Sequence, residues 1–144
     1  MLHIRIIAVG NLKEKYWVNA VEEYTKRLTR YCKFEIVEVR ESNTKDETAE
    51  IRKKIKGKVI LCAIGGSLLS STDLATRIET MSQTTSAISI VIGGSDGVGD
   101  HLDDITDFKI SFGKITLPHQ LFRVILTEQI YRAFTITKGE KYHK

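Results

Sequence analysis

Residues Gly93-Gly94-Ser95-Asp96-Gly97 match the G-x-S-x-G pattern of a nucleophile elbow, and they follow an apolar segment typical of a strand. A serine at such a turn attacks a carbonyl carbon, and later parts of the chain supply a histidine and an acid. Asp103 or Asp107, followed by His119 or His143, has the order found in hydrolases of this class. The chain is short for that fold, and the residues after the turn begin a helix poorly. A serine hydrolase based on Ser95 is therefore kept as an alternative.

Other short patterns carry less information. The run Gly94-x-x-Gly97-x-Gly99 has its spacings in the wrong order for a dinucleotide-binding turn, and it does not lie in the first strand–helix unit. The four histidines lack the spacing of metal ligands, so no metal site is expected. A basic run over residues 52–58 is typical of a solvated helix face and is an unspecific candidate for contact with RNA.

The hydrophobic pattern predicts strands that alternate with helices. We therefore expect an α/β fold with a mostly parallel sheet flanked by helices, in one domain covering residues 1–144. The expected strands are residues 3–9, 34–39, 59–64, 88–92 and 108–112, and the expected helices are residues 13–31, 46–56, 71–81, 100–105 and 118–138.

Three glycine-containing turns are expected at the carboxyl ends of these strands, where parallel sheets bind ligands. They are Gly65-Gly66, Gly93-Gly94 and Gly113. Glycine lets a backbone approach a ligand closely, so the three together indicate a pocket lined by backbone. At the helix starts, Asp46 and Thr116 are the expected capping residues, and Pro118 suits a first helical position.

The last predicted helix, residues 118–138, is apolar on more than one face. A surface helix shows a single apolar stripe, so this one must be buried both in its own core and against another molecule. A second copy of the chain is the simplest partner, and we expect a homodimer. The large apolar residues are Leu121, Phe122, Val124, Ile125, Leu126, Ile130, Ala133 and Phe134.

Composition sets the broad class. Hydrophobic residues make up 42% of the 144 residues and charged residues 28%, which are the proportions of a globular protein. No apolar run approaches the roughly 18 residues of a membrane span, the first residues lack a signal-peptide pattern, and two cysteines are too few for a disulfide framework. We expect a cytoplasmic protein with no membrane partner. The net charge of +4 mildly favours an anionic partner.

Four segments together carry a resemblance to a known family. They are Ile92–Gly97, the Leu117-Pro118-His119 step with Arg123, the block Glu128–Ala133, and the terminal Tyr142-His143-Lys144. With them the chain resembles, over its whole length, the SPOUT-class rRNA methyltransferases of the RlmH type. The resemblance implies methylation of N3 of a pseudouridine in large-subunit (23S) rRNA with S-adenosyl-L-methionine. It also implies a homodimer and a trefoil knot at the C-terminal end, a topology that patterning alone does not suggest.

The same resemblance implies which residues form the site. His143 is the titratable candidate for removing the N3 proton, Tyr142 can orient or stack the base, and Arg132 can bind phosphate or stabilise an anion. Without the resemblance, the tail would be interpreted as a frayed end. The implied cofactor-binding residues are Leu61, Cys62, Gly93, Gly94, Phe112, Gly113, Lys114, Ile115, Thr116 and Leu117.

The implied partners are a second copy of the chain and large-subunit rRNA, which we expect it to meet in the assembled ribosome. Two alternatives of other classes stay open beside the methyltransferase. One is the serine hydrolase with Ser95 as nucleophile. The other is a dimer that binds the ribosome and catalyses nothing.

Overall fold

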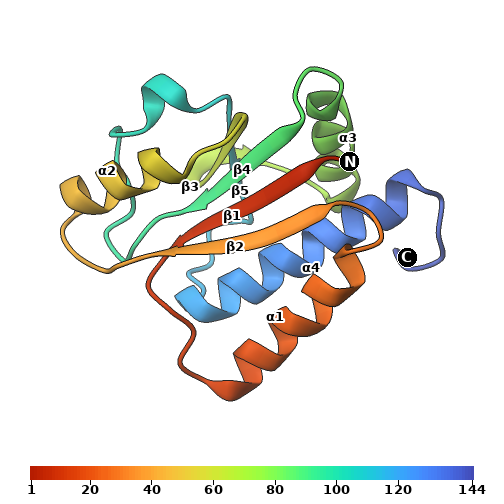
Figure 1. Cartoon of the computed structure of the whole chain (residues 1–144), viewed down its shortest axis with the longest axis horizontal. Helices are drawn as coiled ribbons and strands as arrows, with labels where there is room; N and C mark the ends of the chain where they lie inside the picture. The colour runs from red at the N-terminus through yellow and green to blue at the C-terminus, as the bar shows by residue number, and fades with distance from the viewer.

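The computed structural model describes all 144 residues and contains one sheet (Figure 1). Its five strands are all parallel, in the order β2-β1-β4-β3-β5, which confirms the expected α/β fold with helices flanking a parallel sheet. The elements are β1 (His3–Val9), α1 (Lys15–Leu28), β2 (Lys33–Val39), α2 (Thr44–Lys54), β3 (Lys58–Leu68), α3 (Ser71–Ser82), β4 (Ala87–Ile92), the 3-10 helix η1 (Asp103–Ile105), β5 (Phe108–Ser111) and α4 (His119–Thr137).

Alternation along the strands sends hydrophobic side chains to two cores. In β1, Ile4 and Ile6 face the larger core, which α1, α3 and α4 cover, whereas Ile7 faces the smaller core beneath α2 and residues 98–105. Figure 1 shows α2 and η1 on one side of the sheet and the other three helices on the opposite side. Each fully buried side chain of this size contributes roughly 1.5–3 kcal/mol of transfer free energy, so both faces hold the sheet in place. None of the helices combines the length and the apolar character needed to cross a bilayer.

Strand β3 is longer than predicted, and the turn expected at Gly65-Gly66 does not exist. The strand continues to Leu68, and both Cys62 and Ser67 are paired with Ile110 of β5 across a bulge. A Cβ atom at Gly66 would lie 2.6–2.8 Å from backbone atoms of Ile110. Glycine at position 66 is therefore needed for the close approach of β5, and the turn predicted there was wrong because the strand continues through it.

Two expected helix caps also differ in the structure. The cap of α2 is Asn43, whose side-chain oxygen accepts a hydrogen bond from Asp46 N at 2.8 Å, so Asp46 lies inside the first turn. Helix α4 begins at His119 with Pro118 as its boundary residue, and Thr116 makes no capping hydrogen bond. The cap of α3 is Ser70, which forms a reciprocal capping box with the first turn of that helix.

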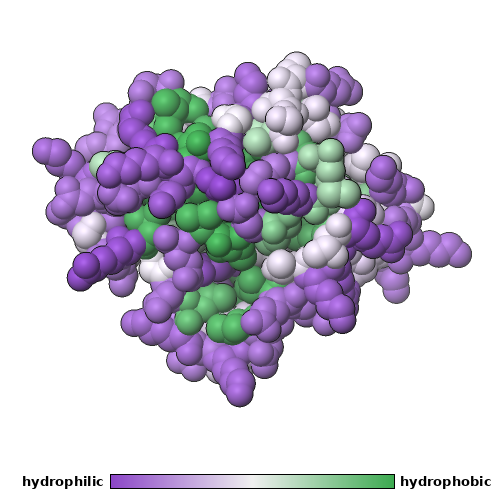
Figure 2. Space-filling view, in the orientation of Figure 1, coloured by the Kyte–Doolittle hydropathy of each residue, from purple (hydrophilic) through white to green (hydrophobic).

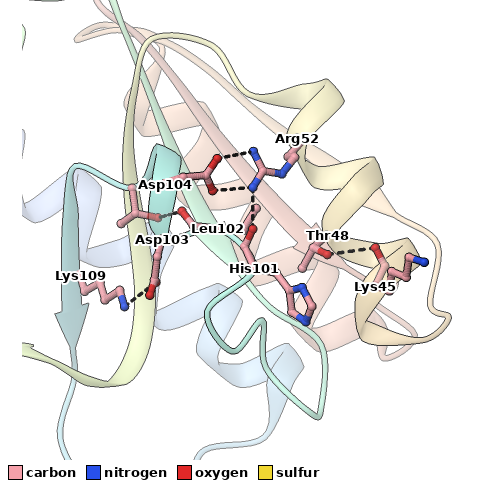
Figure 3. A network of polar contacts seen from close by, with 9 residues as sticks. Lys45, Thr48, Arg52, His101, Leu102, Asp103, Asp104 and Lys109 are labelled. Atoms are coloured by element: carbon pink, nitrogen blue, oxygen red, sulfur yellow. Dashed lines mark hydrogen bonds and ion pairs between the residues drawn. The ribbon is translucent and has the colours of Figure 1, made fainter.

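A polar network holds the segment after β4 against α2 (Figure 3). Arg52 of α2 donates to both carboxylate oxygens of Asp104 and, at 2.6 Å, to the carbonyl oxygen of His101. Lys109 of β5 pairs with Asp103 at 2.7 Å. These contacts fix the far end of the segment that begins with the Gly93–Gly97 turn, and so they position that turn.

The bulge in β3 makes a prediction with an internal control. Gly66→Ala should lower the free energy of unfolding by about 1–3 kcal/mol, because the new Cβ overlaps the backbone of β5. Gly65→Ala should leave stability almost unchanged, because nothing lies within 4 Å of the position of its Cβ. Urea unfolding of both variants measures the difference, and equal effects would contradict the interpretation of the bulge.

Candidate active site

Two loops at the carboxyl end of the sheet have backbone groups available for a ligand. One is the Gly93–Gly97 turn after β4, and the other is residues 112–118 between β5 and α4. Within the chain, no backbone N–H of residues 114–117 or of residues 93–95 donates a hydrogen bond outside the regular elements. Backbone donors in native structures are paired with protein, water or ligand, so these two loops can bind a ligand largely through their main chains.

The glycines of the first turn have a packing role that the sequence did not reveal. A Cβ at Gly93 would lie 2.9 Å from a Val98 methyl carbon, and a Cβ at Gly94 would lie 2.6 Å from Oε1 of Glu47. A side chain at Gly93 would therefore press on Val98 and on the backbone of Gly97, whereas one at Gly94 would require the Glu47 carboxylate to move. Gly113 has φ +119°, a backbone conformation that other residues rarely adopt, and nothing lies within 4 Å of the position of its Cβ.

Glu47 is a buried carboxylate at this turn that the sequence analysis missed. It lies in the first turn of α2 and is only 6% exposed. Its Oε2 accepts a hydrogen bond from Ser42 N at 2.8 Å. The residue lies at the amino-terminal end of α2, where the helix dipole favours carboxylate oxygens. Glu47 thus links α2 to the loop after β2, and its carboxylate occupies the space beside Gly94.

Leu61 and Cys62 lie in β3 beside β4, where Cys62 is paired with Ile92. Leu61 is 1% exposed and belongs to the smaller core. Burial raises the pKa of the Cys62 thiol to about 12, which keeps it protonated and unreactive at neutral pH. Both residues are thus neighbours of the strand that leads to Gly93, but their side chains point to opposite faces of the sheet, that of Leu61 into the smaller core and that of Cys62 against the larger one.

The amino-terminal half of α4 is tied to the loop after β1 and to strand β2. Arg123 is 5% exposed, forms an ion pair with Glu38 and donates to the carbonyl oxygen of Gly10 at 3.2 Å. One turn earlier, Oε1 of Gln120 accepts from the backbone N–H of Lys13 at 2.8 Å, just before α1 begins. A buried guanidinium that loses its partner is strongly destabilising, so these contacts fix where α4 starts.

The three residues implied as catalytic are brought together at the other end of α4. Arg132 Nη1 lies 3.1 Å from Nδ1 of His143, and its guanidinium carbon lies 4.8 Å from the centroid of the Tyr142 ring. Glu128, one turn earlier, accepts a hydrogen bond from Arg132 Nε at 2.7 Å and orients the guanidinium. Burial raises the pKa of Tyr142 to about 12, so its hydroxyl stays neutral.

The contact between Arg132 and His143 fixes the tautomer of the imidazole. A guanidinium only donates, so Nδ1 of His143 must be the acceptor, and the proton of the neutral ring is then on Nε2. In this arrangement Nε2 can donate a hydrogen bond, whereas the lone pair on Nδ1 is already engaged. The geometry therefore favours His143 as a hydrogen-bond donor over the proton acceptor that the sequence analysis expected.

The tail is held in place by contacts to α4 and to the turn between α1 and β2, which were not predicted from the sequence. Glu140 Oε2 accepts a hydrogen bond from the Tyr31 hydroxyl at 2.7 Å, and Arg30 lies 3.7 Å from Oε1 of Glu140. The rings of Tyr131 and Tyr142 meet edge to face at 4.7 Å. The tail is therefore anchored and is not a frayed end.

The two loops at the carboxyl end of the sheet, residues 93–97 and 112–118, are separated from the tail within one chain. Phe112 packs against Phe122 of α4, with ring centroids 5.1 Å apart. Arg132 follows Phe122 by ten residues, which is about 15 Å along a helix that rises 1.5 Å per residue. Phe112 also faces α3, where it lines a cavity of about 180 Å³ together with Ser71 and Ile125. The tail instead faces α1, so one chain does not bring the two sets of residues together.

The structure contains no serine triad. Ser95 is exposed and forms no hydrogen bond with a histidine. Asp103 pairs with Lys109, and Asp107 accepts a hydrogen bond from Val59 N at 2.8 Å. Neither acid is therefore free to orient an imidazole, and the geometry gives the serine hydrolase no support.

A parallel sheet whose carboxyl-end loops present unpaired backbone groups is the arrangement of α/β proteins that bind a small ligand there. The family model described as "Predicted SPOUT methyltransferase" matches residues 2–143, and the chain belongs to that family. A protein of Oenococcus oeni named ribosomal RNA large subunit methyltransferase H is 48% identical over the whole of both chains. A protein of Latilactobacillus sakei with the same name is 45% identical over 99% of this chain and 100% of its own length.

Among solved structures, the SpoU methyltransferase AviRb from Streptomyces viridochromogenes aligns with a TM-score of 0.46 at 7% identity. The alignment covers 98% of this chain and 62% of that chain.

The anchor of the tail is expected to weaken at alkaline pH. Burial, followed by the hydrogen bond to Glu140, raises the pKa of Tyr31 to about 12 from its ordinary value near 10. The stabilisation from the neutral hydroxyl is fully present below about pH 10 and is lost as the pH rises through about 12. Tyr31→Phe should therefore show a shallower loss of thermal stability between pH 9 and 11 than the wild type. Parallel pH profiles for the two proteins would contradict this assignment.

Proposed function

We propose that this chain is an S-adenosyl-L-methionine-dependent rRNA methyltransferase that methylates N3 of a pseudouridine in large-subunit rRNA. The observation that carries the proposal is the 48% identity, over the whole length of both chains, to a protein named as a large-subunit rRNA methyltransferase. Membership of the SPOUT methyltransferase family supports the reaction class. A protein that acts on ribosomes would work in the cytoplasm.

S-adenosyl-L-methionine would be held by the two loops at the carboxyl end of the sheet. Their unpaired N–H groups can recognise the edge of an adenine without diagnostic side chains, which suits the backbone donors of residues 114–117 and 93–95. Leu61 and Cys62 would wall the pocket from β3, and Glu47 places a negative charge beside Gly94. When bound, the cofactor supplies an electrophilic methyl group on a positively charged sulfur.

The reaction forms a bond from N3 to the methyl carbon as the bond from that carbon to sulfur breaks. The N3 proton leaves to solvent, and the electron pair of the broken bond stays on sulfur. As N3 loses its proton, negative charge spreads to the adjacent carbonyl oxygens of the base. His143 Nε2–H can donate to one of them, and the positive charge of Arg132 stabilises the same anion. Tyr142, neutral and in van der Waals reach of Arg132, can stack on the base.

The site is proposed to be completed by a second copy of the chain. Methyl transfer needs reacting atoms within about 3–3.5 Å, whereas Arg132, which contacts the tail, lies about 15 Å along α4 from Phe122, the residue on which Phe112 packs. The outward side of α4 carries half-buried Leu121 and Val124, and the neighbouring loop exposes 84% of Ile115. Figure 2 shows hydrophobic surface among the hydrophilic residues of one face of the molecule, including the region where α4 begins. A homodimer would cover this surface and bring a partner's tail to each pair of loops.

The trefoil knot is part of the same proposal. It rests on membership of the SPOUT family and is expected at the C-terminal end of the chain. A knotted chain should unfold, and refold from the fully denatured state, more slowly than an unknotted protein of equal length, because threading adds a slow step.

The role of His143 can be tested with two substitutions. If Nε2–H donates to the reacting base, His143→Gln should keep the rate of methyl transfer within about 10-fold of wild type, because an amide N–H can replace the donor. His143→Ala should lose about 10²-fold or more. Single-turnover rates at saturating cofactor are the measurement. Equal, large losses in both variants would instead support a proton-accepting role.

The function itself is tested by incubating the protein with radiolabelled S-adenosyl-L-methionine and ribosomes from cells that lack the activity. Label mapped to a single pseudouridine of large-subunit rRNA is the expected result. Labelling of Ser95 by a serine-directed probe, with no methyl transfer, would favour the hydrolase. RNA binding with neither cofactor binding nor transfer would favour a non-catalytic ribosome-binding dimer.

A further inference from the structure

Tyrosine and arginine side chains alternate on the surface where α1, α4 and the tail meet. The ring centroids of Tyr24 and Tyr131 are 6.0 Å apart, and those of Tyr31 and Tyr131 are 6.1 Å apart. The guanidinium of Arg27 lies 5.3 Å from the Tyr24 ring centroid and 5.6 Å from that of Tyr131, and the guanidinium of Arg30 lies 5.0 Å from the ring of Tyr31. We call these five residues the arginine–tyrosine surface.

The guanidinium of Arg27 is held in place but is only partly used by the protein. Its Nε donates to Glu23 at 2.8 Å, and its two terminal nitrogens have no partner within the chain. Its side chain is 41% exposed, and that of Arg30 is 69% exposed. A helix contact that only had to pack would be made by aliphatic side chains, which lose less hydration than an arginine. The terminal N–H groups of Arg27 are held in a fixed orientation and have no partner in the protein, which points to an external anion as their acceptor.

The surroundings of the arginine–tyrosine surface are positively charged, like its two arginines. Residues from the last turn of α1 and from the tail add positive charge around the arginine–tyrosine surface, and Figure 1 shows the C-terminus near the end of α1. Glu23, Glu128 and Glu140 are each already engaged by an arginine. The nearby basic residues are Lys26, Lys138, Lys141 and Lys144. The local potential thus attracts a polyanion.

We propose that the arginine–tyrosine surface is a binding site for an unpaired RNA strand, beside the tail that acts on the target nucleotide. This rests on the proposed function. A nucleobase would stack on the open face of the Arg27 guanidinium or on an exposed edge of Tyr24, and the terminal N–H groups of Arg27 would contact a phosphate. Because Tyr131 also packs on Tyr142, a base bound here lies one side chain away from the tail. The surface would hold a nucleotide flanking the target.

The test measures binding of a fluorescein-labelled single-stranded RNA oligonucleotide to the full-length protein by anisotropy, at several salt concentrations. Arg27→Gln should weaken binding about 10-fold and reduce the slope of log K against log salt by about 0.7, the effect of one lost phosphate contact on a single strand. Arg27→Lys keeps the positive charge but removes the planar guanidinium on which a base would stack. The salt slope should therefore stay near the wild-type value while the affinity for RNA falls.

Arg77→Gln is the matched control. Arg77 also lies over an aromatic ring, 3.8 Å from the centroid of Phe108, but it is beside β5, at the opposite edge of the sheet from β2. Its substitution removes the same charge and the same kind of contact, and it should leave RNA affinity and salt slope unchanged. Equal losses in the Arg27 and Arg77 variants would overturn the proposal, because the effect would then be one of net charge.

Two further readouts separate this surface from the proposed catalysis. Calorimetry should give the same affinity for S-adenosyl-L-methionine in Arg27→Gln and wild type, and methyl transfer should show a raised KM for rRNA with kcat unchanged. The proposed surface would be overturned if Arg27→Gln lost affinity for S-adenosyl-L-methionine. It would also be overturned if Arg27→Gln bound RNA as tightly as an active wild type. If the wild type binds RNA in a way that depends on Arg27 but transfers no methyl group, the proposed RNA-binding surface stands and the proposed methyltransferase activity is contradicted.

Discussion

The length and rigidity of α4 constrain the rest of this molecule. A helix cannot shorten, so the loop before it and the tail after it are held apart by its rise of about 1.5 Å per residue. Arg123, buried against Glu38 and the carbonyl oxygen of Gly10, fixes where the helix starts. Packing of Leu126 and Ile130 into the larger core fixes how it lies on the sheet. The carboxyl-end loops and the tail are therefore rigidly placed at different sites on one chain.

The same placement explains why a protein this small can carry out a two-substrate reaction. In the proposed function, the loops at the end of the sheet would offer backbone groups to a cofactor, and the far end of α4, where Arg132, Tyr142 and His143 lie together, would meet the second substrate. Different residues position each set. Glu47 and Val98 pack against the turn after β4, and Glu128 orients Arg132 beside the tail. Association of two copies would join the sets without any additional domain.

Local patterns were enough to predict most elements, whereas contacts between distant segments were not. The strands β1 and β4 and the helix α4 depend on the hydrophobic pattern of neighbouring residues, and all three were predicted from it. The extension of β3 through Gly66 depends on the approach of Ile110, which no local pattern reveals. The buried pair of Arg123 and Glu38 joins residues 85 positions apart. The tail has no hydrophobic pattern, so only the family resemblance singled out His143, and its tautomer emerged from the contact with Arg132.

The most direct measurement of the central claim, that each site is shared between two chains, uses mixed dimers. One variant ends at Lys141 and keeps intact loops, and the other carries Gly113→Val in the loop before α4 and keeps its tail. Each variant alone should be inactive. If the partner supplies the tail, a 1:1 mixture that is unfolded and refolded together should recover roughly a quarter of wild-type methyl transfer, because half of the dimers are mixed and each has one complete site. A mixture as inactive as its two components would contradict a shared site and would show that each tail acts on its own chain.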